Sequence, residues 1–492
     1  MKRPGLLLSI SPILIAIALL MSCVFLFGED LSGGAAQIAL SITLIYISII
    51  GVYYLKVPWE KIEEGIGYNL HKSTGAILIL LMIGALTATW MLSGIVPTMI
   101  YYGLQLIHPK VFIVVTFVVC ALVSILAGSS WTTVGTIGVA MLGAGSIIGL
   151  PTGWVAGAVI SGAYMGDKLS PLSDTVNLAA AVAGTDLYTH VRYSMYTAIP
   201  AFVVCAIVYG IVGAVIPTSD AVHLETQLEA IKGAFTVSPW LLLIPCLTFF
   251  MVVKKIPATI TLFISALAAG LVTFFVQKGI VVQITGGESG FIPGFKALVQ
   301  MMGSPVDIET GNEMLNSLAR TKGMSRMVDT IWLVICIMAV GGALSATGMI
   351  DVITERLLKA VKSTGSVIAT TLTTCIACNC VLADQYMSVL LPGNMFSGLY
   401  RKKRLAPEVL SRTLGDSATV SSVLVPWNTC ALVQSNVLGM STMAYFPFSI
   451  FCFITPLIAA LMGYTNYNIR TLPEDDATDA PDAASKIQTA SI

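Results

Sequence analysis

The second half of this chain repeats polar features of the first half, inside segments that are otherwise apolar. Residues 84–91 read GALTATWM, and residues 342–349 read GALSATGM. Two Gly-Asp pairs, ending in Asp167 and Asp416, lie at a similar offset of roughly 250 residues, and matched interruptions of this kind are typical of transporters built from two repeats. Such a chain is expected to bind its substrate near the middle of a membrane, where the repeats meet.

The composition places the chain in a membrane. Of its 492 residues, 56% are hydrophobic and only 11% are charged, and the mean hydropathy is +0.87. The sequence therefore predicts an all-α polytopic membrane protein with about 11 to 13 membrane segments. Apolar runs near the roughly 18 residues needed to span a bilayer include residues 5–27, 35–55, 111–126, 198–215 and 441–461.

Positive charges at the ends of apolar runs predict the orientation. Lys2 and Arg3 precede the first run, and residues 401–404 form another basic cluster. By the positive-inside rule these ends face the cytoplasm, which places the N-terminus there. The first run is longer than a signal peptide and lacks a small-residue cleavage site before Glu29, so it is predicted to be the first membrane helix. The formal net charge is zero, so the lipid bilayer, and no nucleic acid, is expected as a partner.

The chain divides into five predicted regions. Residues 1–73 hold two N-terminal helices and a cytoplasmic loop, and residues 74–217 form the first repeat. A connector at residues 218–328 has two linking helices and polar loops, and the second repeat follows at residues 329–464. Residues 465–492 form a tail that is predicted to be disordered, because its part after Arg470 is acidic and lacks aromatic residues.

Two polar breaks interrupt the apolar runs of each repeat. The first-half breaks are residues 127–133 and 166–177, and their second-half counterparts are residues 379–385 and 415–429. Irregular backbone at membrane depth is tolerated only where it is buried in protein or lines a water-filled cavity. The four breaks therefore predict discontinuous helices or re-entrant hairpins around one central cavity, in two halves of inverted topology.

Four acids lie in these breaks: Asp167, Asp174, Asp384 and Asp416. An acid at membrane depth is expensive, so the default interpretation is functional. Because desolvation disfavours the charged form, one carboxylate can hold either a proton or a small hard cation, and competition between the two is the minimal requirement for an antiporter. The alternative interpretation of each acid is a helix cap at a break, which Asp favours.

Other polar side chains in the breaks complete the predicted ion site. Hard cations prefer oxygen ligands. Lys168 either tunes a neighbouring carboxylate or contacts an anionic substrate; in the alternative interpretation it extends to the cytoplasmic interface. The predicted supporting ligands are Ser129, Ser130, Thr132, Ser173, Thr175, Asn177, Asn379, Ser417 and Asn428.

The ten cysteines do not indicate a disulfide framework, because almost all lie within apolar runs, where cysteine acts as a small hydrophobic residue. Cys375, Cys378 and Cys380 form a tight group, but no histidine is nearby. A transition-metal site is therefore not expected, nor is any cofactor.

Residues 166–179, preceded by GSSWTTVG at residues 128–135, resemble the signature of the NhaC-type Na⁺/H⁺ antiporter family of the ion transporter superfamily. The resemblance covers most of the chain. It implies a multi-pass carrier of the bacterial inner membrane that exchanges cytoplasmic Na⁺ for external H⁺, with hairpins meeting at a central site. The positions that match the signature are Asp167, Ser173, Asp174, Thr175 and Asn177, whereas the second-half candidates rest on the repeat alone.

Three alternatives to Na⁺/H⁺ exchange remain. Some relatives couple these ions to organic acids and exchange malate for lactate; such a site should hold a fixed cation, and Lys168 is the only basic residue in the four breaks. An intramembrane aspartyl protease is disfavoured because the sequence lacks its Gly-x-Gly-Asp arrangement, so the chain is not expected to be an enzyme. A channel is disfavoured by the paired breaks, which suit alternating access. The sequence is compatible with a homodimer.

Overall fold

The computed structural model describes residues 3–27, 34–217, 221–288, 290–350, 352–353 and 363–472. Within these residues every named element is a helix, and β-pairing is limited to the isolated bridges Val306–Thr321 and Leu405–Thr471. The prediction of an all-helical protein is confirmed. The predicted disordered tail lies outside the described residues from 473 onward. Its first part, residues 465–472, is folded against the protein instead: Thr471 pairs with Leu405, and the Tyr193 hydroxyl donates to the Asn468 carbonyl at 2.6 Å.

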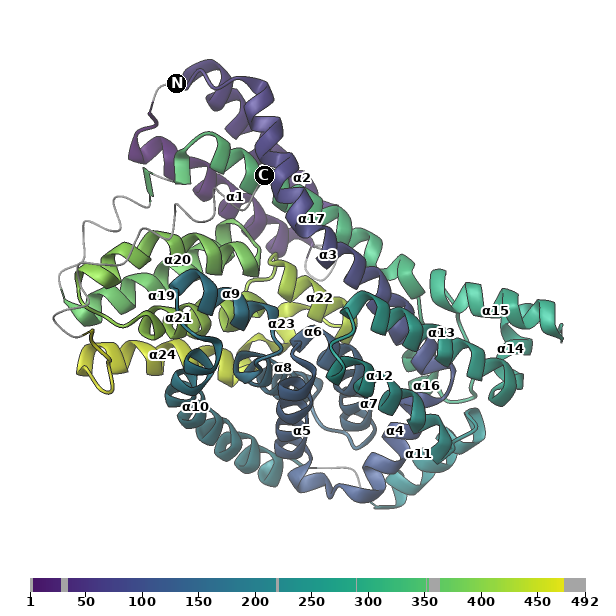
Figure 1. Cartoon of the computed structure of the whole chain (residues 1–492). Coiled ribbons are helices and arrows are strands. Elements are labelled where there is room, and N and C mark those ends of the chain that lie inside the picture. The colour runs from purple at the N-terminus through teal and green to yellow at the C-terminus, as the bar shows by residue number, and fades with distance from the viewer. Residues whose placement is uncertain are drawn as a thin grey trace.

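Four long helices form the upper part of the molecule in Figure 1. Helix α17 packs against both α2 and α3, and α1 packs against α2. Residues 59–73, expected as a loop, are instead the beginning of α3. The four helices are α1 (Leu6–Phe27), α2 (Ala35–Ile49), α3 (Trp59–Leu92) and α17 (Val328–Ala346).

The rest of the first repeat lies in the centre and lower part of Figure 1. Its longest helix, α10, precedes the connector, and its other helices are short because the breaks divide them. They are α4 (Ile95–Leu106), α5 (Phe112–Ala127), α6 (Ser130–Thr133), the π-helical turn η4 (Val134–Gly138), α7 (Val139–Ile147), α8 (Thr152–Leu169), α9 (Asp174–Ala183) and α10 (Leu187–Val215).

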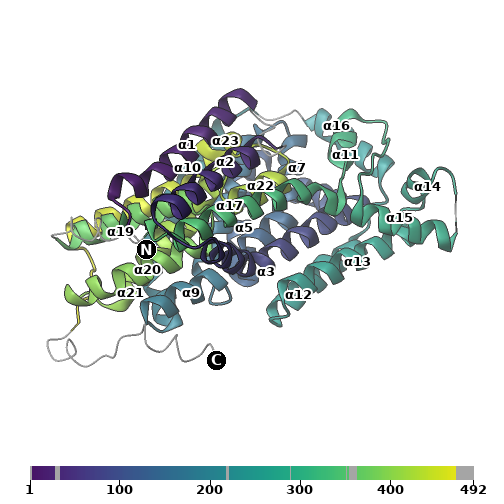
Figure 2. The same ribbon diagram turned by 90° about the horizontal axis from the view of Figure 1, so that it is seen from above.

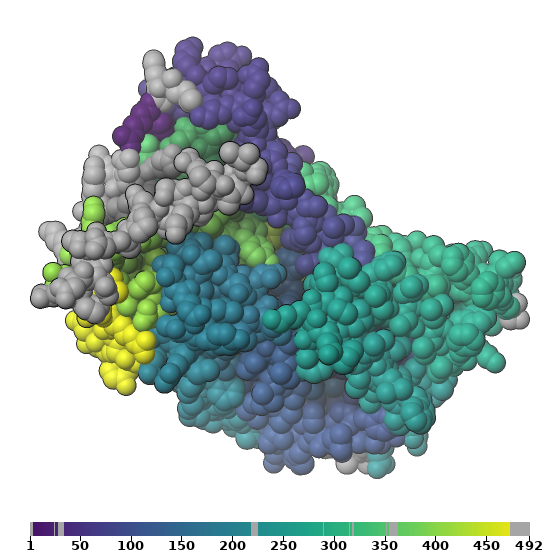
Figure 3. Space-filling model, viewed as in Figure 1, coloured from purple at the N-terminus to yellow at the C-terminus, as the bar shows by residue number. Residues whose placement is uncertain are grey.

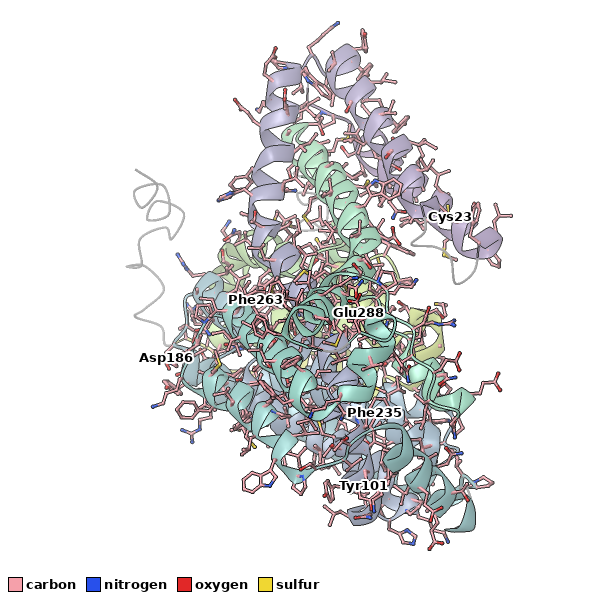
Figure 4. The ribbon with its side chains drawn as sticks, turned by 90° about the vertical axis from the view of Figure 1, so that its right-hand side faces the viewer. Cys23, Tyr101, Asp186, Phe235, Phe263 and Glu288 are labelled. Carbon is pink, nitrogen blue, oxygen red and sulfur yellow. The ribbon has the colours of Figure 1, made fainter. Side chains whose placement is uncertain are left out.

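The connector forms a separate group of helices, which gathers on one side of the molecule when it is seen from above (Figure 2). Two of them, α12 and α13, match the predicted linking helices, whereas the stretch expected as polar loop also contains α14, α15 and α16. The group comprises α11 (Ala221–Ala234), α12 (Leu243–Val253), α13 (Ala258–Val276), α14 (Lys278–Thr285), α15 (Phe291–Gly303) and α16 (Glu313–Ala319). From the connector side, Tyr101 of α4 lies near the lower end of the molecule, and Cys23 of α1 lies at its right-hand edge in the upper half (Figure 4).

The second repeat has the same order of helices and breaks as the first. Each half consists of four helical segments, with one break after the first segment and another before the last. The four segments are α5, α6–α7, α8 and α9 in the first half, and α19, α20, α21–η7 and α22 in the second. The two halves interlock, because α9 packs against α20 and α21 while α22 packs against η4. The second-half elements are α19 (Thr364–Val381), α20 (Gln385–Lys402), α21 (Pro407–Leu414), η7 (Gly415–Thr419), α22 (Thr429–Leu438), α23 (Thr442–Tyr445) and α24 (Ile450–Thr465).

Among the described residues, eight helices are long and apolar enough to cross a membrane, or up to ten if each of two bent pairs is one span. The segments beside the breaks, such as α6 and α9, are too short to be counted in this way. The chain is thus a multi-pass membrane protein.

Close packing of α8 on α5 positions the first-half acid. A Cβ atom at Gly162 would lie 2.3 Å from the Phe117 carbonyl oxygen, and one at Gly166 would lie 2.3 Å from the Ala121 carbonyl oxygen. Only glycine allows the two backbones to approach this closely. The Ser124 hydroxyl of α5 also donates to the Ala163 carbonyl at 2.6 Å. The end of α8 is therefore held beside the break that follows α5.

Candidate ion-binding site

A cavity of about 670 Å³ lies where the breaks of both halves meet. Its walls come from α3, the break between α5 and α6, the break between α8 and α9, the turn between α12 and α13, and the start of α20. The space-filling view shows the surface hollowed where α3, the region of α9 and the α12–α13 turn meet (Figure 3). Three of the four predicted acids line this cavity: Asp167, Asp174 and Asp384.

Asp167 lies in the last turn of α8 and is only 7% exposed. The Ser130 hydroxyl donates to its Oδ2 atom at 2.8 Å. The break that precedes Ser130 is built by Gly128, whose φ of 66° is left-handed, and by Ser129, whose side chain caps α6 by accepting from the Thr132 amide at 3.2 Å. The short helix α6 thus begins directly beside the carboxylate, and its N-terminal end stabilises negative charge there.

The second break of the first half brings several oxygens to the cavity. Ser173 caps α9, and its hydroxyl lies 3.0 Å from that of Thr175. Asn177 donates to the carbonyls of Pro171 at 3.2 Å and Ser173 at 2.8 Å, which holds the unwound turn in place. Asp174, the first residue of α9, is exposed within the cavity. The other predicted ligands of this half, Ser129, Ser130 and Thr132, also line the cavity.

Asp384 contributes the second half's acid to the cavity. It caps α20, because its Oδ1 atom accepts from the Met387 amide at 2.9 Å. The preceding residue, Ala383, has a left-handed φ of 50°, which turns the chain sharply into the helix. Asp384 therefore both caps a helix and lines the cavity, so the two interpretations of this acid are compatible.

Asp416 lies apart from the cavity walls. It is fully buried and forms an ion pair with Lys168, while Thr197 donates to the same carboxylate oxygen at 2.7 Å. Arg412, one turn earlier, places its Nε atom 3.6 Å from the other carboxylate oxygen and its guanidinium over the Tyr193 ring. Lys168 is buried here instead of extending to the interface. This network joins α8 of the first repeat to η7 of the second.

The three remaining second-half ligands also lie outside the cavity walls and bond to protein atoms. The Asn379 amide donates to the Ala418 carbonyl at 2.8 Å, and the Ser417 hydroxyl donates to the Leu372 carbonyl at 2.7 Å. Asn428 caps α22 by accepting from the Cys430 amide at 3.0 Å. These side chains therefore stabilise the breaks through hydrogen bonds within the protein, away from the cavity.

Several cavity residues escaped the sequence analysis because they lie outside the breaks. Asn69, Lys72 and Ser73 come from α3, and Lys255 comes from the α12–α13 turn. Residues 59–73 were expected to be loop, which removed the α3 residues from consideration. The signal was present, since Asn69 and Ser73 are four residues apart and so share one helical face.

The site thus gathers carboxylate, hydroxyl and amide oxygens beside the starts of three helices, α6, α9 and α20. Oxygen-rich sets of this kind coordinate hard cations, and a buried carboxylate can take a proton in place of the cation.

A multi-pass helical membrane protein with duplicated, interrupted segments belongs to the broad class of secondary transporters. The model of the Na⁺/H⁺ antiporter family matches residues 162–467. The chain is 36% identical to the Na⁺/H⁺ antiporter NhaC of Alkalihalophilus pseudofirmus, over 88% of this chain and 91% of the relative. It therefore belongs to the Na⁺/H⁺ antiporter family, and the resemblance to NhaC-type members is confirmed.

Two other relatives are named as antiporters of organic solutes. The chain is 33% identical to a malate-2H⁺/Na⁺-lactate antiporter of Bacillus subtilis, over 87% of this chain and 89% of the relative. It is 32% identical to the arginine/ornithine antiporter ArcD of Halobacterium salinarum, over 98% of this chain and 97% of the relative.

Proposed function

We propose that this chain exchanges Na⁺ for H⁺ across the bacterial inner membrane, with Asp167 as the central ion-binding group. The observation that carries the proposal is the meeting of acids from both repeats, Asp167, Asp174 and Asp384, in one cavity. The similarity in sequence to the Na⁺/H⁺ antiporter NhaC supports the choice of Na⁺ and H⁺.

Competition for the Asp167 carboxylate couples the two ions. When Na⁺ occupies the site, the carboxylate, the Ser130 hydroxyl and the oxygens of Ser173 and Thr175 supply its ligands. When Na⁺ leaves, a proton neutralises the carboxylate, so the site crosses the membrane without an unpaired buried charge. Movement of the interlocked breaks then exposes the site to the other side, which is the alternating access expected of two-repeat carriers.

The cavity opening is assigned to the cytoplasmic side. Lys72 and Lys255 lie at its walls and are exposed, and basic residues beside membrane segments favour the cytoplasm. The N-terminus is proposed to lie on that same side, on the basis of Lys2 and Arg3.

The test is Na⁺-driven proton efflux from everted membrane vesicles, measured by the recovery of acridine-orange fluorescence. Asp167→Asn and Asp174→Asn should each abolish the recovery while the proteins insert normally, because neither amide can exchange a proton for a cation. The control is Arg320→Gln, since Arg320 is 73% exposed and pairs with Asp307 away from the cavity. Full recovery in both aspartate variants contradicts the site.

A second candidate function is exchange of organic acids coupled to Na⁺ and H⁺. Lys72 and Lys255 supply the fixed cations that a carboxylate substrate requires, and both line the cavity. The malate–lactate relative supports this candidate. Saturable counterflow of labelled malate in proteoliposomes, lost in Lys72→Gln, would favour it over exchange of inorganic ions alone.

A further inference from the structure

Two buried polar side chains beside the cavity lack hydrogen-bond partners in the part of the chain that the structure describes. Gln434, in the middle of α22, is 0% exposed, and neither its amide oxygen nor its amide nitrogen is bonded. The Tyr164 hydroxyl of α8, in a residue that is 1% exposed, forms no hydrogen bond of good geometry either, although it lies beside the side chains of Gln434 and Cys430. Buried polar atoms are almost always hydrogen-bonded, because an unpaired one costs about 1–3 kcal/mol. Exceptions call for an explanation, and a ligand or water is a common one.

These side chains continue directly from the cavity. Gln385 lines the cavity wall, and the Cys430 thiol lies 3.1 Å from its side-chain oxygen. Cys430 and Gln434 are four residues apart and therefore share one face of α22. Tyr164 faces both of them, and it lies one turn before Asp167 on α8.

Beyond Gln434, the next polar residue of α22 is Ser435, which points about 100° away from Gln434 on a neighbouring face. Ser435 is half-buried, and its hydroxyl lies 2.8 Å from that of Thr442. Gly439, just beyond the helix, is exposed. Thr429, the first residue of α22, donates its amide to the carbonyl of Ala383, the neighbour of the cavity residue Asp384. At the helical rise per residue, Gly439 lies about 15 Å along the helix from Thr429. Helix α22 therefore extends from the edge of the cavity to an exposed position at its far end.

The helix opposite α22 has an irregular backbone. α22 packs against η4, the π-helical turn that interrupts the segment between α6 and α7. Such turns occur mostly as local bulges and are frequent at functional sites. They supply a place where one helix can shift against another without losing all of its backbone hydrogen bonds.

We propose that Tyr164, Cys430 and Gln434 line the closed half of the transport pathway, and that the Gln434 amide oxygen and the Tyr164 hydroxyl bind Na⁺ as it passes between Asp167 and the side of the membrane opposite the cavity. This inference rests on the proposed function. Both groups present neutral oxygens, which suit a partly dehydrated alkali cation. When α22 separates from η4, the same atoms come into contact with water.

Cys430 provides a native probe of this pathway. In a full-length chain, the other nine of the ten cysteines are replaced, and Na⁺/H⁺ exchange is first verified. A membrane-impermeant, positively charged methanethiosulfonate is then applied to right-side-out and to everted vesicles, with and without Na⁺. We expect modification of Cys430 in right-side-out vesicles only, slowed by Na⁺ and accompanied by loss of exchange.

The matched control keeps Cys375 as the single thiol. Cys375 is equally buried, but it packs in the core of α19 away from the pathway, so it should stay unmodified. If Cys430 is as inert as Cys375 while exchange proceeds, or if it is modified in everted vesicles only, the pathway is overturned and the proposed function stands. If the wild-type chain exchanges no Na⁺ for H⁺, the proposed function itself fails.

A substitution of Gln434 tests whether its amide binds Na⁺ or only fills space in the protein core. If the amide were only a buried polar group without a role, Gln434→Leu would leave exchange unaltered and stabilise the protein. The proposal predicts instead that Gln434→Leu raises the half-saturating Na⁺ concentration by about tenfold for uptake from the far side. Tyr164→Phe should act in the same direction. Unchanged Na⁺ saturation in both variants overturns the ligand assignment.

Discussion

Asp167 and Asp416 follow glycine at matching positions of the two repeats, yet their surroundings differ. Asp167 lines the cavity and accepts a hydrogen bond from the Ser130 hydroxyl. Asp416 is enclosed by Lys168, Thr197 and Arg412 and is not among the residues that line this cavity. The two matching acids therefore differ in their surroundings: the first faces the cavity, while the second is surrounded by basic side chains of the protein itself.

The residue after each acid explains part of the difference. Lys168 follows Asp167, whereas Ser417 follows Asp416. Neighbouring residues of a helix point about 100° apart. When Asp167 faces the cavity, Lys168 therefore points toward the second repeat, where it forms its ion pair with Asp416. The two repeats thus act as a pair, with the charge network of one acid fixing the helix that carries the other.

The largest expected effect comes from removing the charge of Asp416. Asp416→Asn leaves Lys168 and Arg412 buried without a counter-charge, and breaking a buried ion pair in this way costs about 3–5 kcal/mol. Thermal unfolding of the purified protein in detergent should show a large loss of stability, whereas Asp167→Asn should unfold near the wild-type temperature. Equal stability of the two variants would remove the distinction between the acids.

The second-largest difference in stability is expected between alanine substitutions of the two glycines that precede the acids, Gly166 and Gly415. A Cβ at Gly166 would lie 2.3 Å from the Ala121 carbonyl oxygen, but at Gly415 the nearest atom outside the helix's own backbone, His190 Cε1, would be 3.8 Å away. Gly166→Ala should therefore destabilise the protein by about 1–3 kcal/mol through overpacking. Gly415→Ala should be neutral or stabilising by up to about 1 kcal/mol, because alanine favours helix. The same unfolding measurement checks both, and the reverse order would contradict the packing argument.

Ser130→Ala is expected to have the smallest effect on stability, but a specific effect on the affinity for Na⁺. Removing the hydroxyl that orients Asp167 should raise the half-saturating Na⁺ concentration by about 10- to 100-fold, with a stability loss of only about 1 kcal/mol. The matched control is Ser417→Ala, whose hydroxyl bonds the Leu372 carbonyl. That variant should lose similar stability and keep its Na⁺ saturation; a shift of equal size in both would show that neither hydroxyl acts on the ion site.

More of the cavity lining could be predicted from the sequence in the first half than in the second. Gly128, Ser129 and Ser173 form local signals, because a left-handed glycine and a capping hydroxyl act within a few residues of chain. The positions of Asn379 and Asn428 were visible as polar residues, but whether they face the cavity depends on how α19 and α22 pack. The α3 residues Asn69 and Lys72 were missed because a continuous helix replaced an expected loop.

By itself, the sequence determined that the chain is a helical membrane protein of two related halves, since hydrophobic run length and paired breaks are properties of the chain alone. It also determined which residues begin the interrupted helices, because capping is local. Only the tertiary structure decided that Asp416 is paired with Lys168 while Asp167 lines a cavity. The reason is physical: the free energy of a buried charge depends on neighbours that lie far away in sequence, and these are known only once the two halves are packed together.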